Sequence, residues 1–144
     1  MKKALQLIKK WEGLKLKSYL CPARVWTIGY GHTKGVKSGQ FITEATANAW
    51  LEQEVTAIVA QIEKSLGLVY KNLSQNQIDA LTSFVYNLGI GNFNKSTLKK
   101  LIVQGDLVSA ADEFPKWNKA GKKVLDGLTA RREDERNLFI SSKI

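Results

Sequence analysis

Three side chains capable of chemistry lie close together in this sequence. Glu12 is followed after eight residues by Cys21, and after five more by Thr27. A carboxyl group can donate a proton, a thiolate can accept a proton or attack a carbon atom, and a hydroxyl can orient a water molecule. This grouping predicts a site of proton transfer with Glu12 as the candidate general acid.

Glu12 is expected at the end of a helix. Apolar residues recur at helical spacing over residues 2–12, and Gly13 is a natural residue just past a helix end because it adopts a left-handed backbone easily. The negative end of the helix dipole and the apolar bulk of Trp11 oppose ionisation of a carboxyl group there. Glu12 can therefore keep its proton near neutral pH, as a general acid must.

Residues 25–31 read as a strand rich in β-branched and aromatic residues. Period-two alternation gives it a core face of three large side chains, Trp26, Ile28 and Tyr30. The opposite face carries Thr27 beside Gly29 and Gly31, two positions without a side chain. A flat polar ligand such as a sugar ring could approach the backbone closely at that face.

The type and spacing of these residues resemble the signature of a known family. Glu12, Cys21 and Thr27, followed by IGYGHT, are similar to the signature of the phage-type lysozymes, the endolysins of glycoside hydrolase family twenty-four. The segments LSQNQIDALTSFVYNLGIGNF and GLTARREDERNLF resemble the central helix and turn and the terminal helix of that family. The resemblance implies an α+β, lysozyme-like fold, with a small antiparallel β-lobe and a larger helical lobe joined by a long helix and separated by a cleft.

The resemblance also implies an activity. Members of this family are muramidases that hydrolyse the β-1,4 bond between N-acetylmuramic acid and N-acetylglucosamine in peptidoglycan, which here would serve host cell lysis by a phage or prophage. Glu12 would be the general acid, while Cys21 and Thr27 would manage the attacking water. Because most members have an aspartate at the position of Cys21, the alternative is a non-catalytic peptidoglycan-binding homologue.

Cys21 leaves three interpretations open, because the two-carboxylate template for glycoside hydrolysis is incomplete. Its thiolate could accept a proton from water, which keeps the inverting outcome that the family implies, or attack the sugar and give retention. It could also be a passive small residue. The first two require a thiol that ionises readily, and Arg24 is the only nearby positive charge in the sequence. We favour the first interpretation.

Asn87 and Arg131 each have two interpretations. Asn87 could hydrogen-bond the turn over residues 88–91, or, as the resemblance implies, bind substrate at the cleft together with Gly29 and Gly31. Arg131 could pair with Glu135 at i,i+4 spacing. The resemblance implies instead that Arg131 pairs with the catalytic glutamate and favours its ionised form.

The remaining pattern supplies the elements that hold this site. It predicts a small antiparallel sheet over residues 15–42, a helix capped by Thr43 that ends near Leu66, and a buried helix opened by a capping box of Ser74 and Gln77. These are followed by a short helix that stops at Gly105, another from Asp106 to Phe114, an exposed hairpin or loop over residues 118–127, and a last helix from about Thr129. His32 is expected to bond the backbone of its own lobe.

Composition limits the classes of function. The 144 residues suit one domain spanning 1–144, and 22 Lys and Arg against 13 Asp and Glu give a net charge of +9. This charge favours polyanions such as the bacterial cell wall. A nucleic-acid-binding domain is a rival interpretation, but no recognition motif is found, and we expect no nucleic-acid partner. The single cysteine excludes an internal disulfide.

The setting follows from the same reading. The sequence shows neither a secretory signal nor a membrane-spanning stretch, so we expect the protein to stay in the host cytoplasm until a separate holin releases it to the cell wall. We expect a monomer without stable membrane insertion. One histidine and one cysteine are a poor metal-binding set, and neither a metal nor a cofactor is expected.

Overall fold

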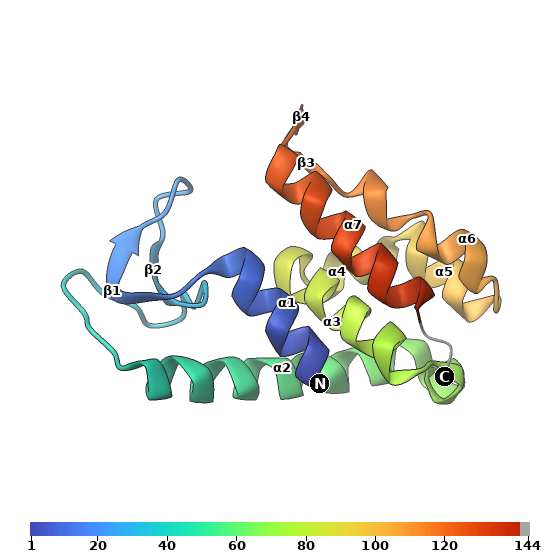
Figure 1. Ribbon diagram of the computed structural model, residues 1–144, viewed down its shortest axis with the longest axis horizontal. Helices are drawn as coiled ribbons and strands as arrows, with labels where there is room; N and C mark the ends of the chain where they lie inside the picture. The colour runs from blue at the N-terminus through green and yellow to red at the C-terminus, as the bar shows by residue number, and fades with distance from the viewer. Residues whose placement is uncertain (142–144) are drawn as a thin grey trace.

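The computed structural model describes residues 1–141 and consists of two lobes of unequal size (Figure 1). The smaller lobe is built around two short strands at one end of a long helix, and the larger lobe is a group of helices along the rest of that helix. The expected α+β arrangement, with a small antiparallel β-lobe and a larger helical lobe joined by a long helix, is confirmed. The expected domain of 1–144 also includes residues 142–144, which lie outside the described residues.

The smaller lobe is an antiparallel hairpin. Strand β1 (Lys15–Leu20) pairs with strand β2 (Trp26–Gly29), and the register places Tyr19 opposite Thr27. An isolated bridge adds Phe41 to the outer side of β1. The small sheet predicted from the sequence is therefore present, and Thr27 is fixed by its cross-strand neighbour.

Helix α2 (Glu44–Leu66) joins the two lobes. It begins where predicted, because the Thr43 hydroxyl accepts a hydrogen bond from the Thr46 amide at 3.1 Å. Its buried stripe consists of Ala47, Leu51, Val55, Ile62 and Leu66. One end of this stripe packs in an apolar cluster with Ile8 and Tyr30, and the other end packs into the core of the larger lobe. The helix thus holds both lobes on one support.

Helix α3 (Gln75–Leu88) is the centre of the larger lobe. Its predicted capping box is present: the Ser74 hydroxyl accepts from the Gln77 amide at 3.1 Å, and the Gln77 side chain accepts from the Ser74 amide at 2.9 Å. Residues 77–85 are all buried, so other elements cover α3 on every side. The other helices between α2 and the last helix are η1 (Gly67–Asn72), α4 (Ile90–Lys95), α5 (Thr97–Val103), α6 (Leu107–Ala111) and η2 (Phe114–Lys116).

Helix α7 (Asp126–Ile140) packs against α3 and starts earlier than predicted. Thr129, the expected start, lies in the first helical turn, where its hydroxyl donates to the Leu125 carbonyl at 3.1 Å. The polar segment ahead of it forms a short hairpin of β3 (Lys119–Ala120) and β4 (Lys123–Val124), as one of the two predicted possibilities. In Figure 1 this hairpin stands at the N-terminal end of α7.

Candidate active site

Glu12 is the last residue of helix α1 (Lys2–Glu12). The helix ends there because Gly13 has a φ of +71°, which takes the chain out of the helical path, and its amide donates back to the Lys9 carbonyl at 3.1 Å. Ala4 and Ile8 are fully buried, so α1 is held firmly from its inner side. Glu12 therefore occupies the predicted helix end, with its side chain 22% exposed.

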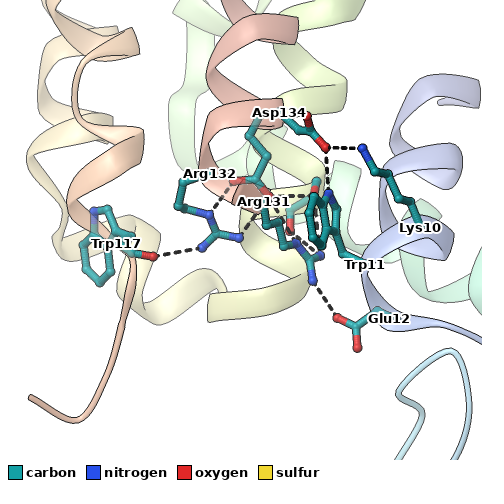
Figure 2. A network of polar contacts seen from close by, with 9 residues as sticks. Lys10, Trp11, Glu12, Trp117, Arg131, Arg132 and Asp134 are labelled. Carbon is teal, nitrogen blue, oxygen red and sulfur yellow. Dashed lines mark hydrogen bonds and ion pairs between the residues drawn. The ribbon is translucent and has the colours of Figure 1, made fainter. Parts of the chain in front are cut away.

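Arg131 lies directly against Glu12 (Figure 2). Its Nη1 donates to Glu12 Oε2 at 2.8 Å, and the Arg131 side chain is only 4% exposed. Its Nε also lies 3.4 Å from Glu135 Oε2. Both pairings considered for Arg131 from the sequence are therefore present at once. The acidic group that faces solvent is backed by a buried positive charge.

A hollow of about 330 Å³ opens at this ion pair. Its lining comes from the ends of α1 and α3 and the start of α7: Trp11, Glu12, Asn87, Leu125, Gly127, Leu128 and Arg131. The Asn87 Oδ1 is buried and has no protein hydrogen-bond partner among residues 1–141. The turn that follows Asn87 is closed by a hydrogen bond between backbone groups, because the Gly89 amide donates to the Val85 carbonyl at 2.7 Å. Asn87 thus lines the hollow that contains Glu12, and its Oδ1 is not used as a turn cap.

The glycines of the β-lobe differ from the predicted alternation. A Cβ built on Gly31 would lie 2.7 Å from Glu12 Oε1, so the backbone of Gly31 approaches the carboxyl group as only glycine allows. A Cβ on Gly29 would instead meet Ile42 at 3.4 Å and Ala47 at 3.6 Å, and Gly29 is buried. The prediction that both glycines share an open face is wrong, because both have positive φ values and the strand no longer alternates regularly. A direct sugar contact at Gly29 loses its structural basis.

Cys21 and Thr27 are close to each other at the tip of the β1–β2 hairpin. The Cys21 amide donates to the Val25 carbonyl at 3.1 Å, and the Thr27 hydroxyl donates to the same oxygen at 2.9 Å. Hydrogen bonding from the Val25 backbone lowers the pKa of the Cys21 thiol below its ordinary range; the Ala23 backbone and the Thr27 hydroxyl act in the same direction, and desolvation opposes them. Because Arg24 plays no part in this shift, the expectation that its charge activates the thiol is replaced by an effect of the hairpin's own backbone.

Tyr19, which the sequence did not single out, connects the hairpin with Glu12. It faces Thr27 across the strands. Desolvation raises the pKa of Tyr19, and the negative charges of Cys21 and Glu12 raise it further. The sequence offered one indication of Tyr19: it is an aromatic residue two positions before Cys21.

Two further residues that sequence reasoning missed hold the site together. Asp134 accepts from Trp11 Nε1 at 2.9 Å and from Lys10 Nζ at 2.7 Å, which fastens the end of α1 to α7 (Figure 2). The Tyr86 hydroxyl donates to the Tyr30 carbonyl and ties α3 to the β-lobe. Both contacts join segments that are distant in the sequence, and nothing local in the sequence marks either of them.

His32 has a structural environment. Its Nε2 lies 3.0 Å from the Lys34 carbonyl and its Nδ1 lies 3.2 Å from Glu54 Oε1, while its ring packs on Trp50 at 4.5 Å between centroids. The predicted bond to the backbone of its own lobe is confirmed, with an added contact to α2. Residues 1–141 contain no group of three side chains arranged to hold a metal ion.

Comparisons with known proteins give a consistent result. The sequence profile described as phage lysozyme matches residues 9–135. The endolysin of Acyrthosiphon pisum secondary endosymbiont phage 1 is 43% identical over 144 residues, and the match covers 97% of this chain and 97% of that protein. The endolysin of Bacillus phage PZA is 44% identical over 140 residues; the match covers 95% of this chain and 53% of that longer protein. The muramidase domain of SpmX from Asticaccaulis excentricus superposes with a TM-score of 0.89 at 33% identity, covering 97% of this chain and 96% of that one.

Proposed function

Because the chain belongs to the phage lysozyme family, we propose that it is an endolysin whose catalytic acid is Glu12. It is a lysozyme-type glycoside hydrolase, and its substrate class is bacterial peptidoglycan. The bond cleaved is the β-1,4 linkage between N-acetylmuramic acid and N-acetylglucosamine. The observation that carries the assignment of Glu12 is its position at the end of α1, paired with Arg131 in a hollow that Asn87 also lines.

The first step is proton donation. A glycosidic oxygen leaves as a poor alkoxide unless it is protonated as the bond breaks, so a protonated Glu12 delivers its proton to that oxygen. The carboxylate that remains is stabilised by the Arg131 guanidinium at 2.8 Å. The Asn87 side chain lines the same hollow and would hydrogen-bond a sugar hydroxyl, which would keep the glycan in position.

The second step is the attack of water on the anomeric carbon. Thr27 orients the water. As the water oxygen bonds to the anomeric carbon, the Cys21 thiolate takes one proton from the water. Glu12 then carries a negative charge and Cys21 a proton, and exchange with solvent restores both. The lowered pKa of Cys21 supports this role because more of the thiolate is present near neutral pH. Water attack predicts inversion, and proton NMR of the first-formed sugar anomer would detect retention if sulfur attacked instead.

The test of Glu12 is the substitution Glu12→Gln, which keeps the size and hydrogen bonding of the side chain but removes its transferable proton. We expect clearing of a cell-wall suspension to fall at least ~100-fold, the lower end for general acid catalysis, with an unchanged circular dichroism spectrum. Glu52→Gln, on the exposed side of α2, is the matched control and should keep full activity. Full clearing by Glu12→Gln would remove this residue from the mechanism, and release of no reducing ends by the native protein would favour the non-catalytic alternative.

We also propose a cellular setting that rests on the family resemblance. The protein is a monomer made in the host cytoplasm, and a separate holin opens the membrane and gives it access to the wall. No helix within residues 1–141 has the length and apolar character needed to span a membrane. Expression without a holin should leave cells intact until the membrane is permeabilised. Lysis without permeabilisation would contradict this setting.

A further inference from the structure

Four charged side chains of alternating sign run from the active site into the protein interior. They are Glu12, Arg131, Glu135 and Arg132, called the charge chain below (Figure 2 labels three of them). Exposure falls along the chain, from 22% at Glu12 to 4% at Arg131 and 0% at Glu135 and Arg132. Arg131 contacts a carboxylate on each side, and Glu135 contacts an arginine on each side. Arg132 ends the chain by donating to the Trp117 backbone carbonyl.

Two of the three guanidinium nitrogens of Arg131 make hydrogen bonds, and the third, Nε, lies against Glu135 without one. Nη1 donates to Glu12 Oε2 at 2.8 Å, and Nη2 donates to the Ser83 carbonyl at 3.2 Å. Nε lies 3.4 Å from Glu135 Oε2. A guanidinium held in this way cannot turn to give its whole charge to either carboxylate. Its positive charge is therefore divided between Glu12 and Glu135.

Glu135 is surrounded by groups that favour its ionised form. Its Oε2 accepts from the Ser83 hydroxyl at 2.6 Å and from Arg132 Nη2 at 3.0 Å, and its Oε1 lies 2.8 Å from Arg132 Nε. Burial raises the pKa of Glu135, and the two arginines and the Ser83 hydroxyl oppose that rise. Arg132 is itself anchored over the Phe84 ring at 5.3 Å.

We propose that Glu135 is a positioning residue for the catalytic acid, which holds part of the charge of Arg131 away from Glu12 so that Glu12 can take up the proton it must donate. This inference rests on the proposed function of Glu12. Two effects act in the same direction: the negative charge of Glu135 competes for Arg131, and its field disfavours a second negative charge at Glu12. Without Glu135, Arg131 would favour the ionised Glu12 too strongly for a general acid.

The other charged or titratable groups around these two carboxyl groups are identifiable. Arg131 from α7, Tyr86 from α3 and Tyr19 from β1 lie near Glu12. Arg131 and Arg132 face Glu135, and its other hydrogen-bonding neighbour is the uncharged Ser83. Within residues 1–141, Glu135 is the carboxylate that shares Arg131 with Glu12, and its removal therefore has a predictable sign.

The test is the pH profile of kcat/KM for Glu135→Gln. The high-pH limb reports loss of the proton from the general acid, and we expect it to move down by about one pH unit, as for a charge of this kind at an effective dielectric constant near 20. At a pH above that limb, activity should fall roughly tenfold, and it should return toward the native value at lower pH. Glu133→Gln is the matched control, because it removes the same kind of charge from the exposed side of α7, where Glu133 lies 3.8 Å from Arg136.

A second variant covers the case in which Glu135→Gln does not fold. The double substitution Glu135→Gln/Arg132→Gln leaves no unpaired Arg132 in the interior, keeps the net charge and predicts the same direction of shift. An unchanged high-pH limb in either folded variant, or an equal shift in Glu133→Gln, would overturn the proposal and leave Glu135 with a purely structural role. Carbon-13 NMR titration of the Glu12 carboxyl reads the same shift without turnover, so failure of this inference is distinguishable from failure of the proposed catalytic role, which Glu12→Gln tests.

Discussion

Replacement of Gly31 by alanine should damage catalysis more than stability. The added methyl group would lie 2.7 Å from Glu12 Oε1 and 3.3 Å from its Cδ, closer than real contacts of this kind, so the carboxyl group must move by a few tenths of an ångström. That movement also disturbs the 2.8 Å contact between Glu12 and Arg131. The proton donor would then be misplaced relative to the glycosidic oxygen.

The size of both effects can be worked out. Alanine at the φ of +79° found at Gly31 costs about 1–2 kcal/mol of backbone strain, which for a chain of this length lowers Tm by roughly 3–8 °C. Misplacement of a catalytic group by less than 1 Å can lower kcat/KM by roughly 10- to 100-fold. Gly31→Ala should therefore remain folded at assay temperature but clear cell walls slowly.

Gly39→Ala separates the two effects. Gly39 has a similar φ of +76°, but a Cβ there would meet nothing within 4 Å. Both variants should show a similar loss of Tm by calorimetry, whereas only Gly31→Ala should lose activity in the turbidity assay. Equal activities of the two variants at a temperature where both are folded would refute the argument that the close approach of Gly31 positions Glu12.

Two further predictions concern the substrate side of the site. Asn87→Ala removes an oxygen that has no protein partner within residues 1–141, so the free energy of unfolding should change by less than about 0.5 kcal/mol while kcat/KM falls by up to about tenfold; a large loss of stability would show that Asn87 supports the fold. Hydrogen bonding from the Val25 backbone lowers the pKa of Cys21. If the Cys21 thiolate is the base, activity should rise with pH, and this rise should occur at a lower pH than the ordinary titration range of a thiol. The substitution Cys21→Asp should move the rise to still lower pH. Cys21→Ser should lose roughly 100-fold in rate, and a wild-type rate and pH profile for Cys21→Ser would show that Cys21 is passive.

The sequence predicted those parts of the fold that depend on neighbouring residues. Thr43 and the pair of Ser74 and Gln77 act on amides within three residues, and each helix starts where these caps place it. Helix α7 was placed too late because its N-cap position is Leu125, which offers no capping side chain, and the first hydroxyl in the segment belongs to Thr129. A local cue therefore fails where a helix begins without a cap.

The candidate site was predictable where its geometry is local and unpredictable where it depends on contacts between distant segments. Gly13 directly after Glu12 predicted that a helix ends there, and helix α1 does end at Glu12. The burial of Gly29 was missed, because a positive φ breaks the strict alternation on which face assignment relies. The contact of Trp11 with Asp134 joins two distant helices, and no periodicity within either segment reveals it.

The contact between Glu12 and Arg131 joins residues 119 positions apart. During translation, α1 and the β-hairpin leave the ribosome long before α7 does, and a domain folds as a unit only once its segments are available. Until α7 docks, the proton donor lacks its counter-charge and the hollow lacks the wall formed by residues 125–131. Nascent chains and products terminated before α7 should therefore be inactive, and docking of α7 completes the active site.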